Sequence, residues 1–199
     1  TTKKLLPTVL KAKIPFFIKV ECLFHLTNNF AYLFLVILAM LQLPNMIIRG
    51  HMDRPELLLL DVPLFAATCV SICVFYVATH QALYKNLWEA IKRLPMMMAL
   101  GIGLSINNSR AVIEGIFGND IEFVRTPKHG ITTSNHTWKK KKYKTKWPVH
   151  SLIEIAFGLY FVATIALAVY TGNWINIPFL VLFMVGFLYV GALSLYQRR

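Results

Sequence analysis

The sequence predicts an all-α membrane protein with four transmembrane helices, amphipathic interfacial helices and a long cytosolic loop. The first observation is composition: of 199 residues, 56% are hydrophobic and only 15% are charged, whereas about a quarter of a soluble domain is charged. The second is a mean hydropathy of +0.55. The third is a set of four apolar segments, each long enough to cross about 30 Å of hydrocarbon as a helix. Together they indicate one helical membrane domain.

Residues 1–19 are predicted to form an amphipathic interfacial helix with a break at Pro15. Proline ends or kinks a helix because it lacks a backbone N–H. The apolar stripe of this helix and the lysines around it are Leu5, Leu6, Val9, Leu10, Lys3, Lys4, Lys11 and Lys13. A short basic amphipathic helix before a span is typical of the membrane interface.

Residues 20–43 are predicted to form the first span, residues 44–56 a loop with two prolines, and residues 57–79 the second span. Polar side chains in the first turns of a span are expensive in lipid and should face protein or water. Those of the first span include His25, Asn28 and Asn29, with Tyr32 one turn later. Tyrosines in a span can stack on sugar faces or anchor the helix at the interface.

Residues 80–118 read as interfacial or re-entrant helices. An amphipathic helix is expected over 81–93, followed by an apolar stretch over 94–106 that is too short to span the membrane. Further on, Arg110 and Glu114 can pair at the i, i+4 spacing. Gly115 and Gly118 are expected to mark the end of this segment.

Residues 119–149 form a polar loop with a basic segment, and residues 150–171 and 174–196 form the third and fourth spans. A tight turn at Thr171-Gly172-Asn173 joins these two spans. All 21 lysines and arginines except Arg49 and Arg54 lie before the first span, between the second and third, or after the fourth. The positive-inside rule therefore places both termini and the polar loop in the cytosol.

Several patterns have a structural and a functional interpretation. Gly101-Ile102-Gly103 lacks the third glycine of a dinucleotide fingerprint, so helix packing or re-entry is the better interpretation. The lysine run over 139–146 can track nucleic acid, but its flanking aromatic residues favour anionic headgroups, and no nucleic-acid partner is expected. The three cysteines, Cys22, Cys69 and Cys73, lie in apolar segments without metal-ligating neighbours and are read as small buried hydrophobic residues.

The acidic residues are few and scattered. The sequence contains no Asp-x-Asp pair that would hold a divalent metal, and Asp120 and Glu122 form only one isolated pair. No catalytic residue and no metal site is therefore assigned to this chain. The glycosylation patterns at Asn107 and Asn135 lie on the predicted cytosolic side, so neither is expected to be modified.

The order of the parts resembles the C-terminal membrane half of processive family 2 glycosyltransferases, such as bacterial cellulose synthase catalytic subunits and glucomannan-synthase-like enzymes. The resemblance covers the whole chain. It is strongest in the segments Phe24–Asn29, Leu100–Ala111, Glu122–Lys128 and Gly186–Gly191. In that family a Phe-x-x-Thr-x-Lys loop acts as a gate that closes over the nucleotide diphosphate.

The resemblance implies that the segment around residues 123–128 is this gating loop. Phe123, Thr126 and Lys128 match the family pattern. Arg125 stands where the family usually has valine, and its guanidinium would strengthen diphosphate binding. The family's catalytic domain, with its metal-binding Asp motifs, precedes this region, so this chain is expected to be the C-terminal part of such an enzyme.

The implied function is that of a membrane module of a polysaccharide-forming hexosyltransferase that uses nucleotide sugars. Its expected partners are the upstream glycosyltransferase domain, the nucleotide sugar, the growing polysaccharide and the lipid bilayer. A divalent cation, Mg²⁺ or Mn²⁺, would be held by the full enzyme and not by this chain alone. The expected location is the bacterial inner membrane. His25, Asn28, Asn29 and Tyr32 are candidates for a glycan path. The alternatives are a non-enzymatic transporter or channel subunit and a bare membrane anchor.

Overall fold

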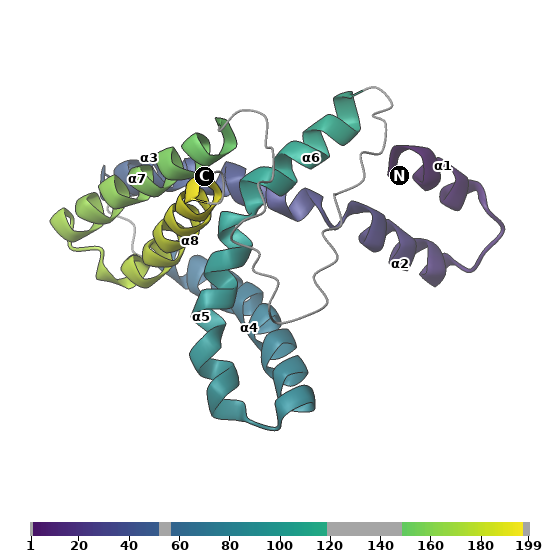
Figure 1. Ribbon diagram of the computed structural model, residues 1–199, viewed down its shortest axis with the longest axis horizontal. Helices are drawn as coiled ribbons and strands as arrows, with labels where there is room; N and C mark the ends of the chain where they lie inside the picture. Colours follow the sequence, from purple (N-terminus) through teal and green to yellow (C-terminus); the bar gives the residue numbers. More distant parts are fainter. Residues whose placement is uncertain (1, 52–56, 119–148, 197–199) are drawn as a thin grey trace, which may run out of the picture.

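The structure is a computed structural model that describes residues 2–51, 57–118 and 149–196, with only the backbone described over 49–51 and 57–69. The described chain is helical throughout and contains no strand. Its elements are α1 (Thr2–Lys11), α2 (Phe16–Thr27), α3 (Phe30–His51), α4 (Leu57–Tyr84), α5 (Leu87–Gly103), α6 (Ser105–Phe117), α7 (Val149–Tyr170), the 3-10 turn η2 (Trp174–Asn176) and α8 (Ile177–Tyr196) (Figure 1).

Three helical segments are long and apolar enough to cross a membrane, and they make this chain a helical membrane protein. They are Phe30–Ile48, Val149–Tyr170 and Trp174–Tyr196, with mean hydropathies of 2.1, 2.2 and 2.2. The last two confirm the predicted third and fourth spans. The predicted second span falls in α4, which is apolar over Val70–Tyr84; the side chains before Val70 lie outside the described residues.

The predicted first span, 20–43, is wrong in its start and in its end. Helix α2 ends at Thr27, and α3 begins only at Phe30, so the polar residues of the predicted span belong to a separate helix and the turn that follows it. At the other end, the predicted loop over 44–56 is wrong over residues 44–51, because α3 continues through Pro44 to His51; residues 52–56 lie outside the described residues.

Helix α3 passes through Pro44 because a tyrosine of another helix satisfies the backbone there. Pro44 has no N–H, so the carbonyl of Met40, four residues earlier, loses its helical donor. The Tyr160 hydroxyl of α7 donates to that carbonyl at 2.7 Å and accepts from the Leu43 N–H at 2.9 Å. Backbone groups freed by proline in a span need another partner, and a neighbouring helix can supply it. The Tyr160 hydroxyl therefore satisfies the backbone of α3 next to Pro44, and we call this pair of hydrogen bonds the Tyr160 clamp.

A double-mutant cycle tests this clamp. Tyr160→Phe should lower the free energy of unfolding by about 1–2 kcal/mol, because it removes both bonds to the α3 backbone. Pro44→Ala restores an N–H that can bond the Met40 carbonyl within α3. In that background we expect Tyr160→Phe to cost less than half as much, as measured by denaturant titration in mixed micelles. Equal losses in the two backgrounds would show that the tyrosine does not act on the proline break.

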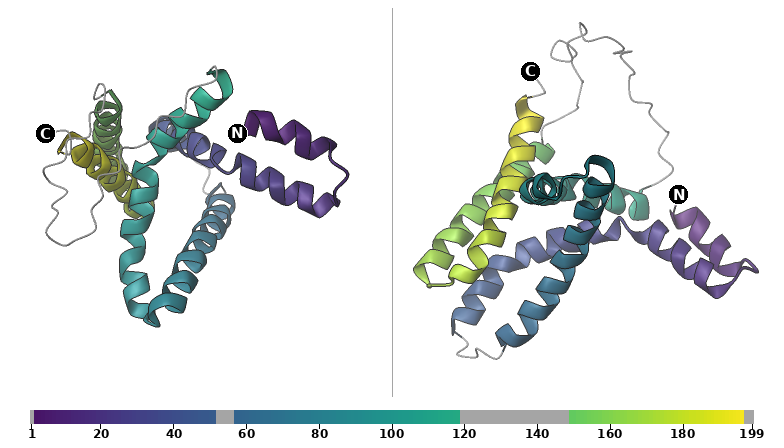
Figure 2. Two further views of the ribbon diagram at one scale, coloured as in Figure 1. Left: turned by 45° about the vertical axis from the view of Figure 1, so that its right-hand side comes forward. Right: turned by 90° about the horizontal axis from the view of Figure 1, so that it is seen from below.

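Helices α7 and α8 form an antiparallel pair that holds the core (Figures 1 and 2). Phe161 of α7 is fully buried and stacks on Phe183 and Phe187 of α8, with ring centroids 5.0 and 5.9 Å apart. The connection between the two helices contains Gly172, which has φ +71°. The Asn173 N–H donates to the Ala168 carbonyl at 2.8 Å, which closes a Schellman motif and confirms the predicted tight turn.

Helix α5 meets α8 through glycine. A Cβ atom at Gly103 would overlap the carbonyl oxygen of Gly186, and one at Gly186 would overlap the carbonyl oxygen of Ala99. Small residues allow such close backbone approach in membrane proteins. Gly186 is the tenth of the 20 residues of α8, so α5 ends near the middle of a span. This contact fits the predicted use of Gly103 in helix packing or re-entry.

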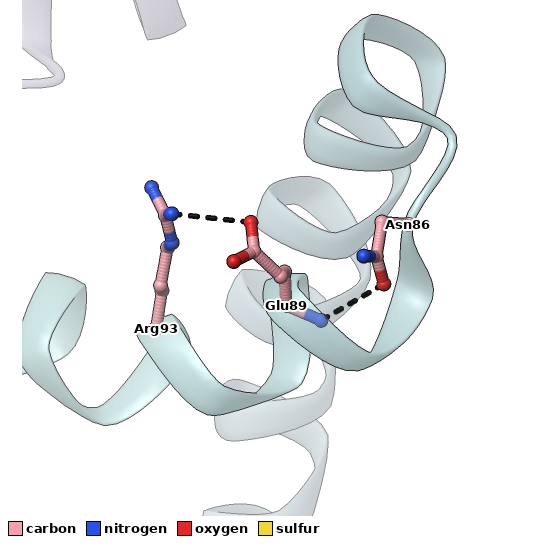
Figure 3. Close-up of polar contacts among 3 residues, drawn as sticks. All are labelled: Asn86, Glu89 and Arg93. Atoms are coloured by element: carbon pink, nitrogen blue, oxygen red, sulfur yellow. Dashed lines mark hydrogen bonds and ion pairs between the residues drawn. The ribbon is translucent and has the colours of Figure 1, made fainter.

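The segment between the second and third predicted spans forms two helices, as predicted, with different bounds. Helix α5 begins at Leu87, after Asn86, whose side chain accepts from the Glu89 N–H at 3.2 Å (Figure 3). Glu89 then pairs with Arg93 at 3.1 Å. Pro95 lies inside α5 without ending it, and this proline is exposed.

The next helix, α6, contains Gly115 and ends before Gly118, which is its C-cap. Gly118 therefore marks the end of the helix as predicted, whereas Gly115 lies inside it. Arg110 and Glu114 form the predicted ion pair on the exposed side of α6. The buried residues of this helix are Ser105, Ile106, Ser109 and Val112, and α6 packs mainly against α3.

The N-terminal residues form a hairpin of two helices in place of the single predicted helix over 1–19. Helix α1 ends at Lys11, and Pro15 precedes the first residue of α2. Proline is well suited to this position because the first N–H groups of a helix have no partner within it. The hairpin projects from the rest of the chain beside the start of α3 (Figures 1 and 2).

Candidate functional site

The best candidate site is an open recess of about 750 Å³ at the junction of α2 and α3. It lies at the start of the first membrane-spanning segment. The residues that line it are Glu21, Phe24, His25, Thr27, Asn28, Phe30, Ala31 and Phe34. The recess therefore combines a small group of polar side chains with three phenylalanines, which is the composition expected of a ligand site.

The recess exists because the chain turns between α2 and α3. Helix α2 stops at Thr27, and two asparagines fill the turn before Phe30. The Asn28 carbonyl accepts from the Ala31 N–H at 3.0 Å, and the Asn29 carbonyl accepts from the Tyr32 N–H at 3.2 Å. Asparagine favours such turns because its side chain competes for backbone hydrogen bonds.

Three polar side chains of the recess lie on one side of α2. Glu21, His25 and Asn28 are spaced four and three residues apart, which places them on one helical face. A carboxylate accepts hydrogen bonds, and an imidazole and an amide both donate and accept them. Thr27 contributes less, because its hydroxyl donates to the Leu23 carbonyl at 2.7 Å. The polar face can therefore bond a ligand that carries several hydroxyl groups.

The aromatic part of the recess is open to a ligand. Phe24 is 69% exposed and Phe34 is 59% exposed, on either side of the turn. Phe30, the first residue of α3, completes the aromatic lining. Exposed phenylalanine faces beside hydrogen-bonding groups suit a ligand that has both apolar faces and a polar rim, such as a sugar ring.

The structure brings together two of the four predicted glycan-path residues. His25 and Asn28 line the recess, whereas Asn29 and Tyr32 are not among the residues that line it. Asn29 is exposed, and Tyr32 is half-buried. The prediction also missed Glu21, although its i, i+4 spacing from His25 marks the same helical face.

The phenylalanines of the recess were missed for a different reason. Phe30 and Phe34 lie in an apolar run of α3 that looks like ordinary lipid-facing sequence. Only the turn after Thr27 brings their faces next to His25 and Asn28. The predicted gating-loop residues Phe123, Arg125, Thr126 and Lys128, together with the whole segment 119–148, lie outside the described residues.

A second polar feature lies in the seam between α7 and α8. Glu154 is 3% exposed, and its Oε2 atom has no hydrogen-bond partner within the described part of the chain. It lies against Gly191, where an added Cβ would come within 3.1 Å of the Glu154 Cβ. Ionisable residues inside spans are expensive and mark functional or pairing sites.

Metal-ligating side chains do not gather anywhere in the described ranges: no three His, Cys, Asp or Glu residues cluster there. The thiols Cys22 and Cys73 are free and half-buried, so the prediction of buried cysteines is only partly right, and the Cys69 side chain lies outside the described residues.

Comparison of the chain with protein-family models, with curated proteins and with solved structures finds no match in any of the three.

Proposed function

We propose that this chain is the membrane module of a polysaccharide-forming glycosyltransferase that uses nucleotide sugars. The module anchors a catalytic domain, gates its nucleotide site and guides the growing glycan into the membrane. The observation that carries the proposal is the recess at the α2–α3 junction, where Glu21, His25 and Asn28 lie beside three phenylalanines. The resemblance of the sequence to family 2 enzymes supports the same function.

The chemistry of the recess suits a glycan better than an ion or a lipid. Each sugar unit offers hydroxyl groups at its rim and C–H groups on its faces. The hydroxyls match the polar face of α2, and the C–H faces match Phe24 and Phe34, whose weak contacts to C–H groups are individually small. An open site also allows a chain to pass, whereas a closed cavity would retain it.

The charge distribution supports a cytosolic position for the gate. In the predicted topology Arg49 and Arg54 lie on one side of the membrane, and the remaining lysines and arginines lie on the opposite side. By the positive-inside rule the more basic side is the cytosol, so we place the recess end of α3 and the segment 119–148 there. Nucleotide sugars are then available to Thr126 and Lys128. Gate closure excludes water from the diphosphate and completes its positive surroundings.

The proposed enzyme needs a divalent cation, Mg²⁺ or Mn²⁺, which in this family neutralises the nucleotide diphosphate. In this proposal the catalytic domain holds the cation, as the resemblance to family 2 enzymes implies. The role of this chain is limited to holding the glycan and closing the nucleotide site. We place the enzyme in the bacterial inner membrane, with both termini of this chain in the cytosol.

Glu154 favours one alternative, a transporter or channel subunit. A buried carboxyl inside a span is a typical pathway residue. In that case Glu154→Gln should abolish ion or solute flux through the reconstituted protein. In the glycosyltransferase proposal the same variant should leave the sugar-transfer rate within about threefold, because the residue lies away from the recess.

Photo-crosslinking tests the recess directly. A photoreactive phenylalanine analogue placed at position 24 of the native gene product should capture radiolabelled glycan during synthesis. The matched control is the same analogue at Leu83, which is equally exposed at 69% but lies at the end of α4. We expect crosslinks from position 24 and none from position 83. Equal capture from both positions, or none from either during active synthesis, would remove the recess from the glycan path.

A further inference from the structure

We propose that the α1–α2 hairpin is a docking surface for anionic lipid headgroups, with Phe16 and Phe17 inserted at the boundary between headgroups and acyl chains. This inference does not depend on the glycosyltransferase proposal. It rests on the exposed apolar side chains of the hairpin, its net positive charge and its attachment to the start of a membrane span.

The hairpin has no core of its own. Neither α1 nor α2 contains a buried residue. Phe16 and Phe17 are 72% and 84% exposed, and their rings meet edge to face with centroids 6.1 Å apart. Adjacent phenylalanines this exposed are unusual on a surface that faces water, whereas aromatic side chains are common where membrane proteins cross the interface. The pair needs an apolar cover outside the hairpin.

The hairpin is strongly basic. Residues 1–27 contain five lysines and one acidic residue, Glu21, which lies near the recess and not beside Phe16 and Phe17. Lys11 closes α1, Lys13 follows it in the connection, and both side chains are exposed directly before Phe16. Lysines beside aromatic residues suit the surface of an anionic leaflet, where the ammonium groups meet negative headgroups and the aromatic rings reach the acyl chains beneath them.

Two other lysines hold the hairpin together and fix its position. The Lys19 ammonium donates to the Leu10 carbonyl at 2.8 Å, and the Thr2 hydroxyl donates to the Leu26 carbonyl at 2.8 Å, so α1 is tied to α2 at both ends. The Lys3 ammonium donates to the Ile116 carbonyl in the last turn of α6 at 3.2 Å. The paired helices thus present the Phe16–Phe17 end as one unit.

The position of the hairpin in the chain selects lipid as the occupant. Helix α2 is followed by two turn residues and then by the span that begins at Phe30. The C-terminal end of the hairpin is therefore held at the membrane boundary, and the hairpin cannot move far from it. Each lysine near an anionic surface strengthens binding about fivefold, so Lys11 and Lys13 together should contribute about thirtyfold.

Spin-label accessibility measures the docking. In a variant of the native gene product with Cys22, Cys69 and Cys73 replaced by serine, a nitroxide on Phe17→Cys reports its exposure to oxygen, which enters lipid, and to a nickel chelate, which does not. The protein is placed in nanodiscs of phosphatidylcholine alone or mixed with phosphatidylglycerol. We expect preferential access of oxygen in the anionic discs, and loss of this preference at high salt, which screens surface charge.

Charge variants separate lipid recognition from general electrostatics. The double variant Lys11→Gln/Lys13→Gln should lower the equilibrium constant for docking on anionic discs by about thirtyfold, so that the label is more exposed to water. Lys85→Gln with Lys92→Gln removes the same charge from the α4–α5 connection and from α5, and should leave the label unchanged.

Three outcomes would overturn the proposal. If the label enters lipid equally in neutral and anionic discs, the hairpin has no preference for anionic headgroups. If the label is exposed to water in both kinds of disc, the hairpin does not dock on the membrane. A label shielded from both oxygen and the nickel chelate shows that protein, and not lipid, covers Phe16 and Phe17.

Discussion

Replacement of Gly186 by alanine is expected to separate α5 from α8 and to lower the free energy of unfolding by about 3 kcal/mol. The added methyl group would overlap the carbonyl oxygen of Ala99, which is a backbone atom and cannot rotate away. Overpacking of a well-packed contact costs about 1–3 kcal/mol, and here the two helix axes must also move apart. Gly103→Ala should behave similarly, because its methyl group would meet the carbonyl oxygen of Gly186.

Gly101 provides the matched control for this prediction. It belongs to the same helix as Gly103, but a Cβ atom at position 101 would meet nothing within 4 Å. Gly101→Ala should therefore be neutral or stabilise the protein by up to about 1 kcal/mol, because alanine favours the helix. Denaturant titration in mixed micelles gives all three values. Equal losses for Gly101→Ala and Gly186→Ala would show that α5 does not rest on α8 through its backbone.

Replacement of Lys128 by alanine in the native gene product is expected to lower the rate of sugar transfer by about 100-fold or more. In the proposed mechanism the lysine ammonium faces the diphosphate when the gate closes. Removal of one such preorganised charged group typically costs two to three orders of magnitude. The variant should still insert and fold normally, because the predicted role of Lys128 is confined to the closed gate.

Lys92→Ala provides the control for Lys128→Ala. Lys92 is an exposed lysine of α5, so its loss changes the net charge equally without touching the proposed gate. Initial rates of incorporation of radiolabelled sugar give the comparison, with the amount of inserted protein measured in parallel. Unchanged turnover of the Lys128 variant would remove the gating role, whatever the rate of the Lys92 variant.

Features that depend on near neighbours were predictable from the sequence. The turn at Gly172 and the Arg110–Glu114 pair each depend on residues within five positions, and the structure contains both. The third and fourth spans were also predictable, because a long apolar segment bounded by turn residues has few alternatives in lipid. Gly103 was correctly associated with helix packing, although its partner Gly186 could not be identified.

Features that depend on distant residues were not predictable. Pro44 looked like the end of a span because nothing nearby can satisfy the Met40 carbonyl; the compensating hydroxyl belongs to Tyr160, 120 positions away from Met40. The recess was predictable only in part. His25 and Asn28 stood out as polar residues before an apolar run, but Phe34 became part of the site only through the turn that separates α2 from α3.

Polymer synthesis by the native gene product tests the central proposal most directly. The protein is reconstituted in lipid vesicles with a divalent cation and supplied in turn with a panel of radiolabelled nucleotide sugars. We predict that at least one of them is converted to a labelled polymer of high molecular weight. If correctly folded and inserted protein forms no polymer from any of the nucleotide sugars, this result would contradict the proposed glycosyltransferase function.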